Sequence, residues 1–110
     1  MSAFLIAQVK VTDPAWIPDY AAKVHDIAAR HGGRYLSRSP NVTRLEGEAP
    51  DVSLVALIQF PDVQSAEAFA KDPDYAPFVA ARQAGSVSNF YVIDDTDAAG
   101  SIPYLPKAQG

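Results

Sequence analysis

Apolar and polar residues recur with two different periods along the chain, and the changes of period divide it into elements. Residues 4–11 and 54–60 are short runs rich in Ile, Leu, Val and Phe, which is typical of strands. Each run ends at a break that contains Asp and Pro, and a helix-like stretch follows it. Shorter strand-like segments, at about 34–38 and 88–94, come after the two helical stretches. The order predicts an α+β, ferredoxin-like βαββαβ fold with an antiparallel sheet and two helices on one face.

Capping residues predict where the two helices begin and end. Asp13 precedes a proline and a stripe of apolar residues at three- and four-residue steps, so it is suited to cap the first helix. Gly32-Gly33 ends that helix, because glycine accepts the left-handed backbone of a C-terminal cap. The second helix begins near Asp62. Asp72-Pro73-Asp74 interrupts it, and a second helical piece is predicted at about 75–84.

The expected sheet has the first and third strands as central neighbours that run parallel, with right-handed crossovers placing both helices on one face. The segment Val42–Glu46 is expected to extend or pair with the sheet edge. One set of alternate positions is wholly apolar: Leu5, Ala7, Val9, Val11, Leu54, Ala56, Ile58 and Phe60. The other set is still mostly apolar: Phe4, Ile6, Gln8, Lys10, Val55, Leu57 and Gln59. No further layer of the chain is predicted to cover this second set.

A second copy of the chain is the simplest cover for the second apolar face. At about 25 cal/mol per Å² of apolar surface, leaving several large side chains wet forgoes several kcal/mol. We therefore expect a homodimer with a two-fold axis and sheet packed against sheet. The competing explanation is a monomer whose tail crosses the face. We expect a domain at 1–95 and an extended tail at 96–110, in which Ile102, Tyr104 and Leu105 are apolar enough to dock.

Composition narrows the functional classes. A chain of 110 residues with a net charge of −4 and scattered basic residues is not suited to bind nucleic acid or an anionic membrane. The absence of cysteine excludes disulfides, a thiol nucleophile and thiolate metal ligands. No apolar run is long enough for a membrane span, so we expect a cytoplasmic protein. The two histidines, His25 and His31, are six residues apart on a helix and point in different directions, so we expect no metal site. We also expect no cofactor.

Several short motifs follow one another in a specific order between residues 3 and 94. They are Val11-Thr12-Asp13-Pro14 with Trp16 and Tyr20, Gly32-Gly33-Arg34-Tyr35-Leu36-Ser37-Arg38, Leu45-Glu46-Gly47, Phe60-Pro61, Asp72-Pro73-Asp74-Tyr75 and Arg82. In this order they resemble the domain of unknown function 1330 family, which belongs to the dimeric α/β-barrel superfamily. The resemblance implies two ferredoxin-like subunits that face each other sheet to sheet. Superfamily relatives include cofactor-free monooxygenases, muconolactone-isomerase-like enzymes, haem-degrading proteins and ligand-binding regulatory domains, so no single activity is implied.

Polar residues within these patterns are the candidates for chemistry. The motif match groups Arg34, Arg38, Glu46, Tyr75 and Arg82 near a cleft between sheet and helices. Arg34 and Arg38 share a parity, arginine suits a carboxylate, and Glu46 is an obvious partner for one of the arginines. The group is therefore an anion site or a structural ion-pair network. Tyr20, like Tyr75, is able to put a hydroxyl into a pocket.

Gln8 and Gln59 are polar positions in the second apolar set of the two central strands. They face a ligand between layers, or they form a hydrogen bond with each other or across the dimer axis.

Two functions follow from these candidates. The first is a cofactor-independent enzyme or binder of a small carboxylated or aromatic metabolite. The second is a non-enzymatic dimer module for ligand sensing or protein interaction, in which the polar groups fix the register. An unpaired, cleft-facing arginine beside an apolar pocket would favour the first. Arginines that are all salt-bridged around a filled cleft would favour the second.

Overall fold

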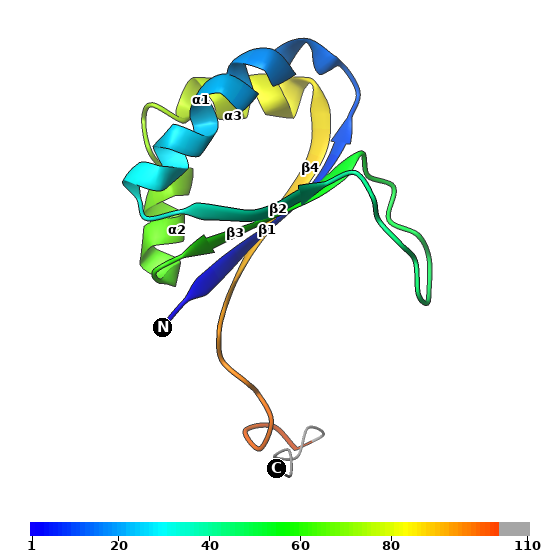
Figure 1. Ribbon diagram of the computed structural model, residues 1–110, viewed down its shortest axis with the longest axis vertical. Helices are drawn as coiled ribbons and strands as arrows, with labels where there is room; N and C mark the ends of the chain where they lie inside the picture. The colour runs from blue at the N-terminus through cyan, green and yellow to red at the C-terminus, as the bar shows by residue number, and fades with distance from the viewer. Residues whose placement is uncertain (104–110) are drawn as a thin grey trace.

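A computed structural model of the protein describes residues 1–103 (Figure 1). The elements are β1 (Ala3–Val11), the 3₁₀ turn η1 (Pro14–Trp16), α1 (Ile17–Arg30), β2 (Arg34–Ser39), β3 (Leu54–Phe60), α2 (Val63–Ala70), α3 (Ala76–Ala84) and β4 (Ser86–Asp94). The four strands form one sheet in the order β2-β3-β1-β4, and the helices cover one of its faces. The predicted ferredoxin-like architecture is confirmed, with the second helix divided into α2 and α3.

The predicted capping residues explain the boundaries of the helices. The Asp13 carboxylate accepts a hydrogen bond from the Ala15 amide at 3.0 Å, before η1 and α1. The Asp62 carboxylate does the same for the Ser65 amide at 2.7 Å, at the start of α2. After α1 the chain turns at Gly32, whose φ of +79° is the left-handed conformation that favours glycine. These local interactions set the lengths of the helices before any packing.

Strand direction differs from the expectation. β1 pairs antiparallel with β3, from Ala3 opposite Phe60 to Val9 opposite Leu54. β1 and β4, and β2 and β3, are also antiparallel, so no neighbouring strands run parallel. Each crossover helix links two parallel strands that have a third strand between them, and this arrangement makes the central pair antiparallel.

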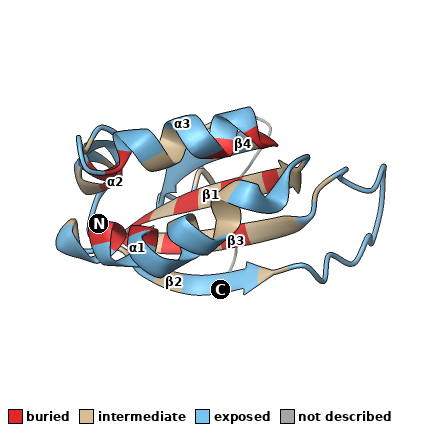
Figure 2. Cartoon of the chain, turned by 90° about the horizontal axis from the view of Figure 1, so that it is seen from above, coloured by how far each residue is buried: buried red, intermediate tan, exposed pale blue. Residues whose placement is uncertain are grey.

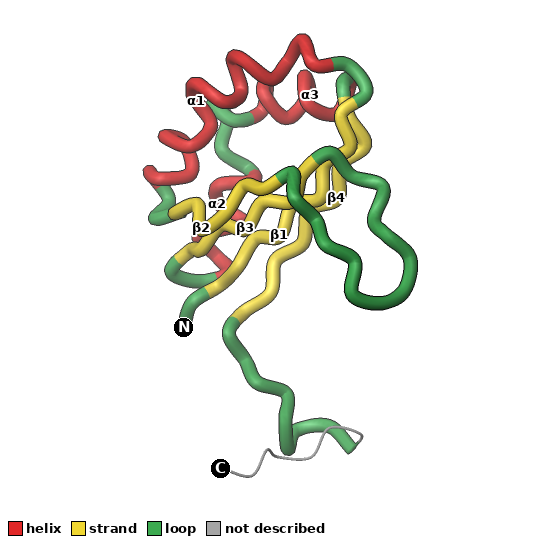
Figure 3. The backbone as a smooth tube through the Cα atoms, turned by 45° about the vertical axis from the view of Figure 1, so that its right-hand side comes forward, coloured by secondary structure: helices red, strands yellow, loops and turns green. Residues whose placement is uncertain are grey.

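The predicted strand extension at Val42–Glu46 is also wrong. The β2–β3 ladder ends where Ser39 opposes Val55, and residues 40–53 form an exposed loop without helix or strand. The base of this loop is fixed by the amide of Ser53, which donates to the Val9 carbonyl at 2.7 Å. A salt bridge of 2.6 Å between Lys10 and Asp51 adds a second anchor. Figure 3 shows the loop projecting from the sheet.

The core lies between the sheet and the helices, as Figure 2 shows. Along β1 every second residue from Ala3 to Val9 is buried, and the residues between them are only partly buried. Phe60 on β3, Phe69 on α2 and Tyr75 before α3 are each 2 % exposed or less, and they stack in one column. The wholly apolar set of strand positions therefore faces the helices, which agrees with its pattern.

The other face of the sheet is apolar and uncovered by residues 1–103. We call it the open sheet face and define it by its apolar residues Phe4, Ile6, Val55, Leu57, Val87, Tyr91 and Ile93, which the strand register places on one side of the sheet. Val87, Tyr91 and Ile93 are 59, 53 and 52 % exposed. The described part of the tail runs away from the sheet after β4 (Figures 1 and 3). Tyr104 and Leu105, which the tail hypothesis also invoked, lie outside the described residues.

Candidate functional site

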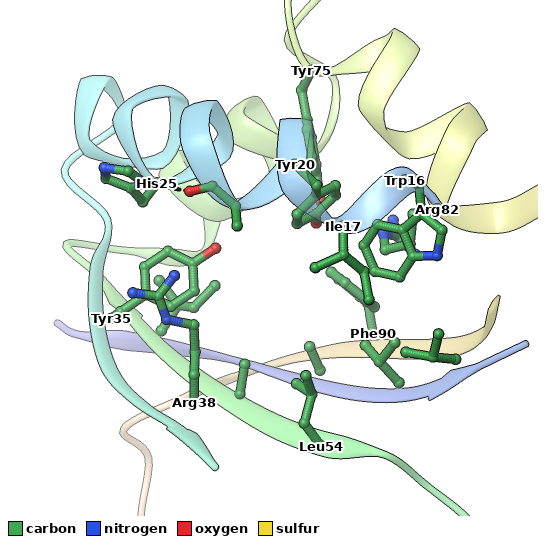
Figure 4. Close-up of a pocket in the computed structure, with 16 residues that line it drawn as sticks. Trp16, Ile17, Tyr20, His25, Tyr35, Arg38, Leu54, Tyr75, Arg82 and Phe90 are labelled. Atoms are coloured by element: carbon green, nitrogen blue, oxygen red, sulfur yellow. Dashed lines mark hydrogen bonds between the residues drawn. The ribbon is translucent and has the colours of Figure 1, made fainter. Parts of the chain in front are cut away.

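A cavity of about 140 Å³ lies between the sheet and the helices α1 and α3 (Figure 4). Its walls are mostly apolar and come from β1, β3, β4 and α1, with Val9, Leu54, Ile58, Phe90, Trp16 and Ile17 among them. Three members of the lining are exposed: Ala21 and His25 from α1, and Arg38 from β2. The cavity therefore opens to solvent between α1 and β2, and it is closed at the α3 end by buried side chains.

Arg82 is the buried charge of this cavity. It lies on α3, lines the cavity and is 6 % exposed. Its guanidinium carbon lies 4.1 Å from the centroid of the Phe90 ring, which is cation–π geometry. Its Nε is buried without a hydrogen-bond partner, and among residues 1–103 the guanidinium forms no salt bridge. An unpaired buried charge is expensive, so the cavity is electrostatically complementary to an anion.

Two tyrosine hydroxyls meet beside this arginine. The Tyr20 and Tyr75 oxygens are 2.5 Å apart. Tyr75 is held rigidly because its ring stacks on Phe69 at 4.4 Å, while Tyr20 packs edge-on against Trp16 at 5.1 Å. Burial raises the pKa of Tyr20, the neighbouring Tyr75 raises it further, and Arg82 opposes the rise only in part. The Tyr20 hydroxyl is therefore neutral near pH 7 and able to donate a hydrogen bond.

A second cationic side chain stands at the mouth. The Arg38 guanidinium carbon lies 4.2 Å above the ring of Tyr35, and both residues line the cavity. Burial raises the pKa of Tyr35 to about 12, although the nearby charges of Arg38 and Arg82 oppose the rise. Two arginines thus face one apolar cavity, one at its mouth and one at its closed end (Figure 4).

The structure brings together Tyr20, Tyr75, Arg38 and Arg82 and separates the other predicted residues from them. A β-bulge between Tyr35 and Ser37 explains why Arg34 is excluded. Because the bulge inserts one residue, Arg34 opposes Gln59 on the open sheet face, whereas Arg38 opposes Ala56 on the helix face. The expected shared parity of the two arginines is therefore wrong.

Glu46 and the two glutamines also lie away from the cavity. Glu46 is exposed in the 40–53 loop and forms no salt bridge within residues 1–103. Gln59 accepts from Arg34 and donates to Ser2, each at 3.2 Å, on the open sheet face. Gln8 opposes Val55, four residues along β3 from Gln59. At about 3.3 Å per residue the two amides are too far apart for the expected mutual hydrogen bond.

Tyr35 and Phe90 are site residues whose role the sequence did not reveal. Neither was among the candidate residues, yet each one lies against an arginine of the cavity. The alternation of the sequence could not have placed Tyr35 beside Arg38, because the two residues share a face only through the extra residue of the bulge.

The remaining ionisable cluster is structural and lies apart from the cavity. His31 contacts the Asp72 carboxylate at 2.7 Å, and Arg30 pairs with Asp72 at 3.3 Å and Asp74 at 3.0 Å. These contacts join the end of α1 to the turn between α2 and α3. Within residues 1–103, no three His, Asp or Glu side chains gather in a way that could hold a metal ion. None of the helices there has the length and apolarity needed to cross a membrane.

Solved structures share this fold at low sequence identity. A protein of unknown function from Rhodopseudomonas palustris, RPA0582, aligns with a TM-score of 0.69 and 19 % identity over 87 % of this chain and 83 % of that one. SnoaB from Streptomyces nogalater, described as a cofactor-independent oxygenase, aligns with a TM-score of 0.62 and 18 % identity over 87 and 94 %. Rv0793 from Mycobacterium tuberculosis gives 0.52 and 14 % over 88 and 97 %. These likenesses show the ferredoxin-like fold.

Sequence comparison gives a family and no described activity. No curated protein matches the chain significantly. The family described as a domain of unknown function, DUF1330, matches residues 2–96, which is most of the chain. The match includes every strand and helix that builds the cavity. The protein is therefore a member of the DUF1330 family.

Proposed function

We propose that this protein binds a small, largely apolar carboxylate in the cavity of each subunit of a homodimer. The observation that carries the proposal is Arg82, a permanent charge that is 6 % exposed and forms no salt bridge within residues 1–103. Arginine does not lose its proton in proteins, so burial cannot be relieved by neutralisation. A carboxylate matches the guanidinium geometrically and supplies the missing charge.

The cavity separates the two functional hypotheses raised by the sequence. A purely structural dimer module would have its arginines paired and its cleft filled by side chains. Here Arg38 and Arg82 form no salt bridge within residues 1–103, and about 140 Å³ between them is free. An engineered apolar cavity of roughly 150 Å³ is known to take up benzene. The geometry therefore favours a ligand with a body about as large as one ring.

The homodimer is supported by the open sheet face. Its apolar side chains run across neighbouring strands, and the most exposed of them, Val87, Tyr91 and Ile93, all lie on β4. Monomeric proteins rarely leave such contiguous apolar patches in water. A second copy related by a two-fold axis would cover this face with the same face, as the fold of dimeric α/β-barrel proteins suggests.

Turnover without a cofactor is a second candidate, favoured by the neutral Tyr20 hydroxyl beside Arg82. A neutral phenol held next to a guanidinium is able to donate a hydrogen bond to a substrate oxygen on which negative charge develops, while the guanidinium balances that charge. SnoaB is described as a cofactor-independent oxygenase. That likeness concerns the fold, so the case for chemistry here depends on the tyrosine and the arginine.

The binding proposal is tested with matched acids and alcohols. Benzoate and 3-methylbutanoate are titrated into the protein beside benzyl alcohol and 3-methylbutanol, with NMR shifts of the lining residues as readout. We expect saturable shifts for the acids and a loss of the preference for acid over alcohol in Arg82→Met. Arg34→Met, on the open sheet face, is the control and should keep the preference for acid over alcohol. Equal binding of acid and alcohol to the wild type, or no binding, would refute the proposal.

The dimer is tested separately by sedimentation equilibrium of the wild type and Leu57→Lys. We expect twice the chain mass for the wild type and a shift towards the monomer for the variant, because the lysine places a charge in the interface. A wild type that stays monomeric over a wide concentration range would contradict the homodimer.

A further inference from the structure

The polar groups that face the cavity are almost all hydrogen-bond donors. Arg38 and Arg82 have only donors, and no Asp, Glu, Asn, Gln, Ser or Thr side chain is among the described residues of the lining. The hydroxyl of Tyr35, which also lines the cavity, is able to donate and to accept. The indole N–H of Trp16 is already used, since it donates to the Gly85 carbonyl at 3.1 Å. His25 stands at the exposed mouth, where its ring nitrogens contact the Ala21 carbonyl and Asp26.

The tyrosine pair contributes one more donor. Two hydroxyls share the contact of 2.5 Å between Tyr20 and Tyr75, and only one of their two protons lies in it. Within residues 1–103 neither hydroxyl makes another hydrogen bond. The remaining O–H therefore has no acceptor, in a region where Tyr75 is 2 % exposed. Buried polar groups are normally hydrogen-bonded, so this proton lacks the partner that a ligand would supply.

These unsatisfied donors require hydrogen-bond acceptors on the ligand in addition to a negative charge. We infer that the cavity selects a small apolar 2-oxo acid, whose carboxylate pairs with Arg82 and whose keto oxygen accepts from the Tyr20–Tyr75 pair, and that it rejects the amino acid with the same skeleton. The inference rests on the proposed binding of a carboxylate. A 2-oxo acid offers acceptors on two adjacent carbons and no donor. An ammonium group at the same carbon would bring a second positive charge next to Arg82 and find no carboxylate to receive it.

The size of the cavity limits the side chain of the acid. With about 140 Å³ available, a branched chain of a few carbons fits against the Val9, Leu54 and Ile58 side of the wall. The probes are therefore 3-methyl-2-oxobutanoate, 3-methylbutanoate and valine. They share one branched hydrocarbon body and differ in whether the second position carries a keto oxygen, hydrogen or an ammonium group.

The test measures dissociation constants for the three probes by NMR titration of the full chain. We expect 3-methyl-2-oxobutanoate to bind about five- to tenfold more tightly than 3-methylbutanoate, the usual value of one hydrogen bond. Valine should bind at least about 100-fold more weakly than the 2-oxo acid, because a charged group left unpaired in a buried site is costly.

Tyrosine variants show whether the hydroxyl pair is the cause. Either single change leaves one hydroxyl free to donate, so the informative variant is Tyr20→Phe/Tyr75→Phe. It should bind the 2-oxo acid and 3-methylbutanoate equally, with the affinity for 3-methylbutanoate unchanged. Tyr91→Phe, on the open sheet face, is the control and should keep the preference, and circular dichroism confirms that each variant is folded.

Different failures have different meanings. Valine binding within threefold of the 2-oxo acid, or a keto preference that survives in the double variant, would overturn this inference while Arg82-dependent binding of acids stood. No binding of any acid would overturn both the inference and the proposed function.

Discussion

Replacing Arg82 by methionine should make the unliganded protein more stable. The change removes a buried charge that has no ion-pair partner in the described part of the chain, and it keeps an unbranched side chain of similar reach. Burying an unpaired ion costs several kcal/mol even after relaxation. The desolvated cation–π contact of 4.1 Å with Phe90 offsets about 2 kcal/mol of this cost. The difference predicts a gain of about 1–3 kcal/mol, and about 4 °C in Tm for each kcal/mol in a domain of this size.

Thermal unfolding followed by circular dichroism measures this gain at one fixed protein concentration, because a dimer's Tm depends on concentration. Arg30→Met is the matched control. Arg30 is half-exposed and paired with Asp72 and Asp74, so its loss should change stability by less than about 1 kcal/mol and should not increase it. The same samples titrated with benzoate should show that Arg82→Met has lost the preference for the acid.

A lower Tm for Arg82→Met would refute the reasoning. It would mean that the guanidinium is compensated in the unliganded protein, for example by ordered water that bridges it to carbonyl groups. Arg82 would then be a structural residue, and its unsatisfied Nε would give no reason to expect an anion.

Three further outcomes test the packing and titration behaviour of the fold. Gly85→Ala should lower the free energy of unfolding by about 1–3 kcal/mol and weaken acid binding, because a Cβ there would lie 2.3 Å from the Trp16 ring that lines the cavity. Chemical unfolding measures the loss of stability. The His31 hydrogen bond lowers the pKa of Asp72, so the ionised carboxylate stabilises the fold above about pH 4, and this stabilisation is lost as the pH falls below that value. The Tm of Asp72→Asn should therefore decline less steeply in acid than the Tm of the wild type. Burial raises the pKa of Tyr35 to about 12, so the folded state keeps this proton to a higher pH than the unfolded state does, and stability should fall as the pH rises above 10. Absorbance at 295 nm, which follows tyrosine ionisation, should show one high-pH ionisation fewer in the Tyr35→Phe variant than in the wild type.

The ends of the helices could be predicted from the sequence, because helix capping depends on residues that are close together in the chain. Asp13, Asp62 and Gly32 cap or end helices through contacts within three residues, and all three do so in the structure. The alternation in strands β1 and β3 was equally readable. Its period identifies which residues share a face, and Leu5 and Ile58 are indeed buried together.

Strand direction, and whether residues 42–46 form a strand, could not be predicted in this way. Side-chain alternation has the same period in parallel and antiparallel pairs, so the pattern contains no information on direction. Val42–Glu46 has the composition of a short strand, but the β2–β3 ladder has already ended at Ser39, and residues 40–53 are neither helix nor strand.

The sequence by itself determined the order of the elements, the ends of the helices, the two apolar faces of the sheet and a short set of candidate residues. Tertiary structure alone decided which candidates share a site. One inserted residue at the β2 bulge sends Arg34 to the open sheet face and Arg38 to the cavity, because each residue added to a strand reverses the face of those that follow. Packing of α1 and α3 on the sheet then brings Tyr20 against Tyr75 and leaves Arg82 buried without a partner. The absence of a counter-ion is a property of three-dimensional surroundings, and this absence is the physical basis for expecting a ligand.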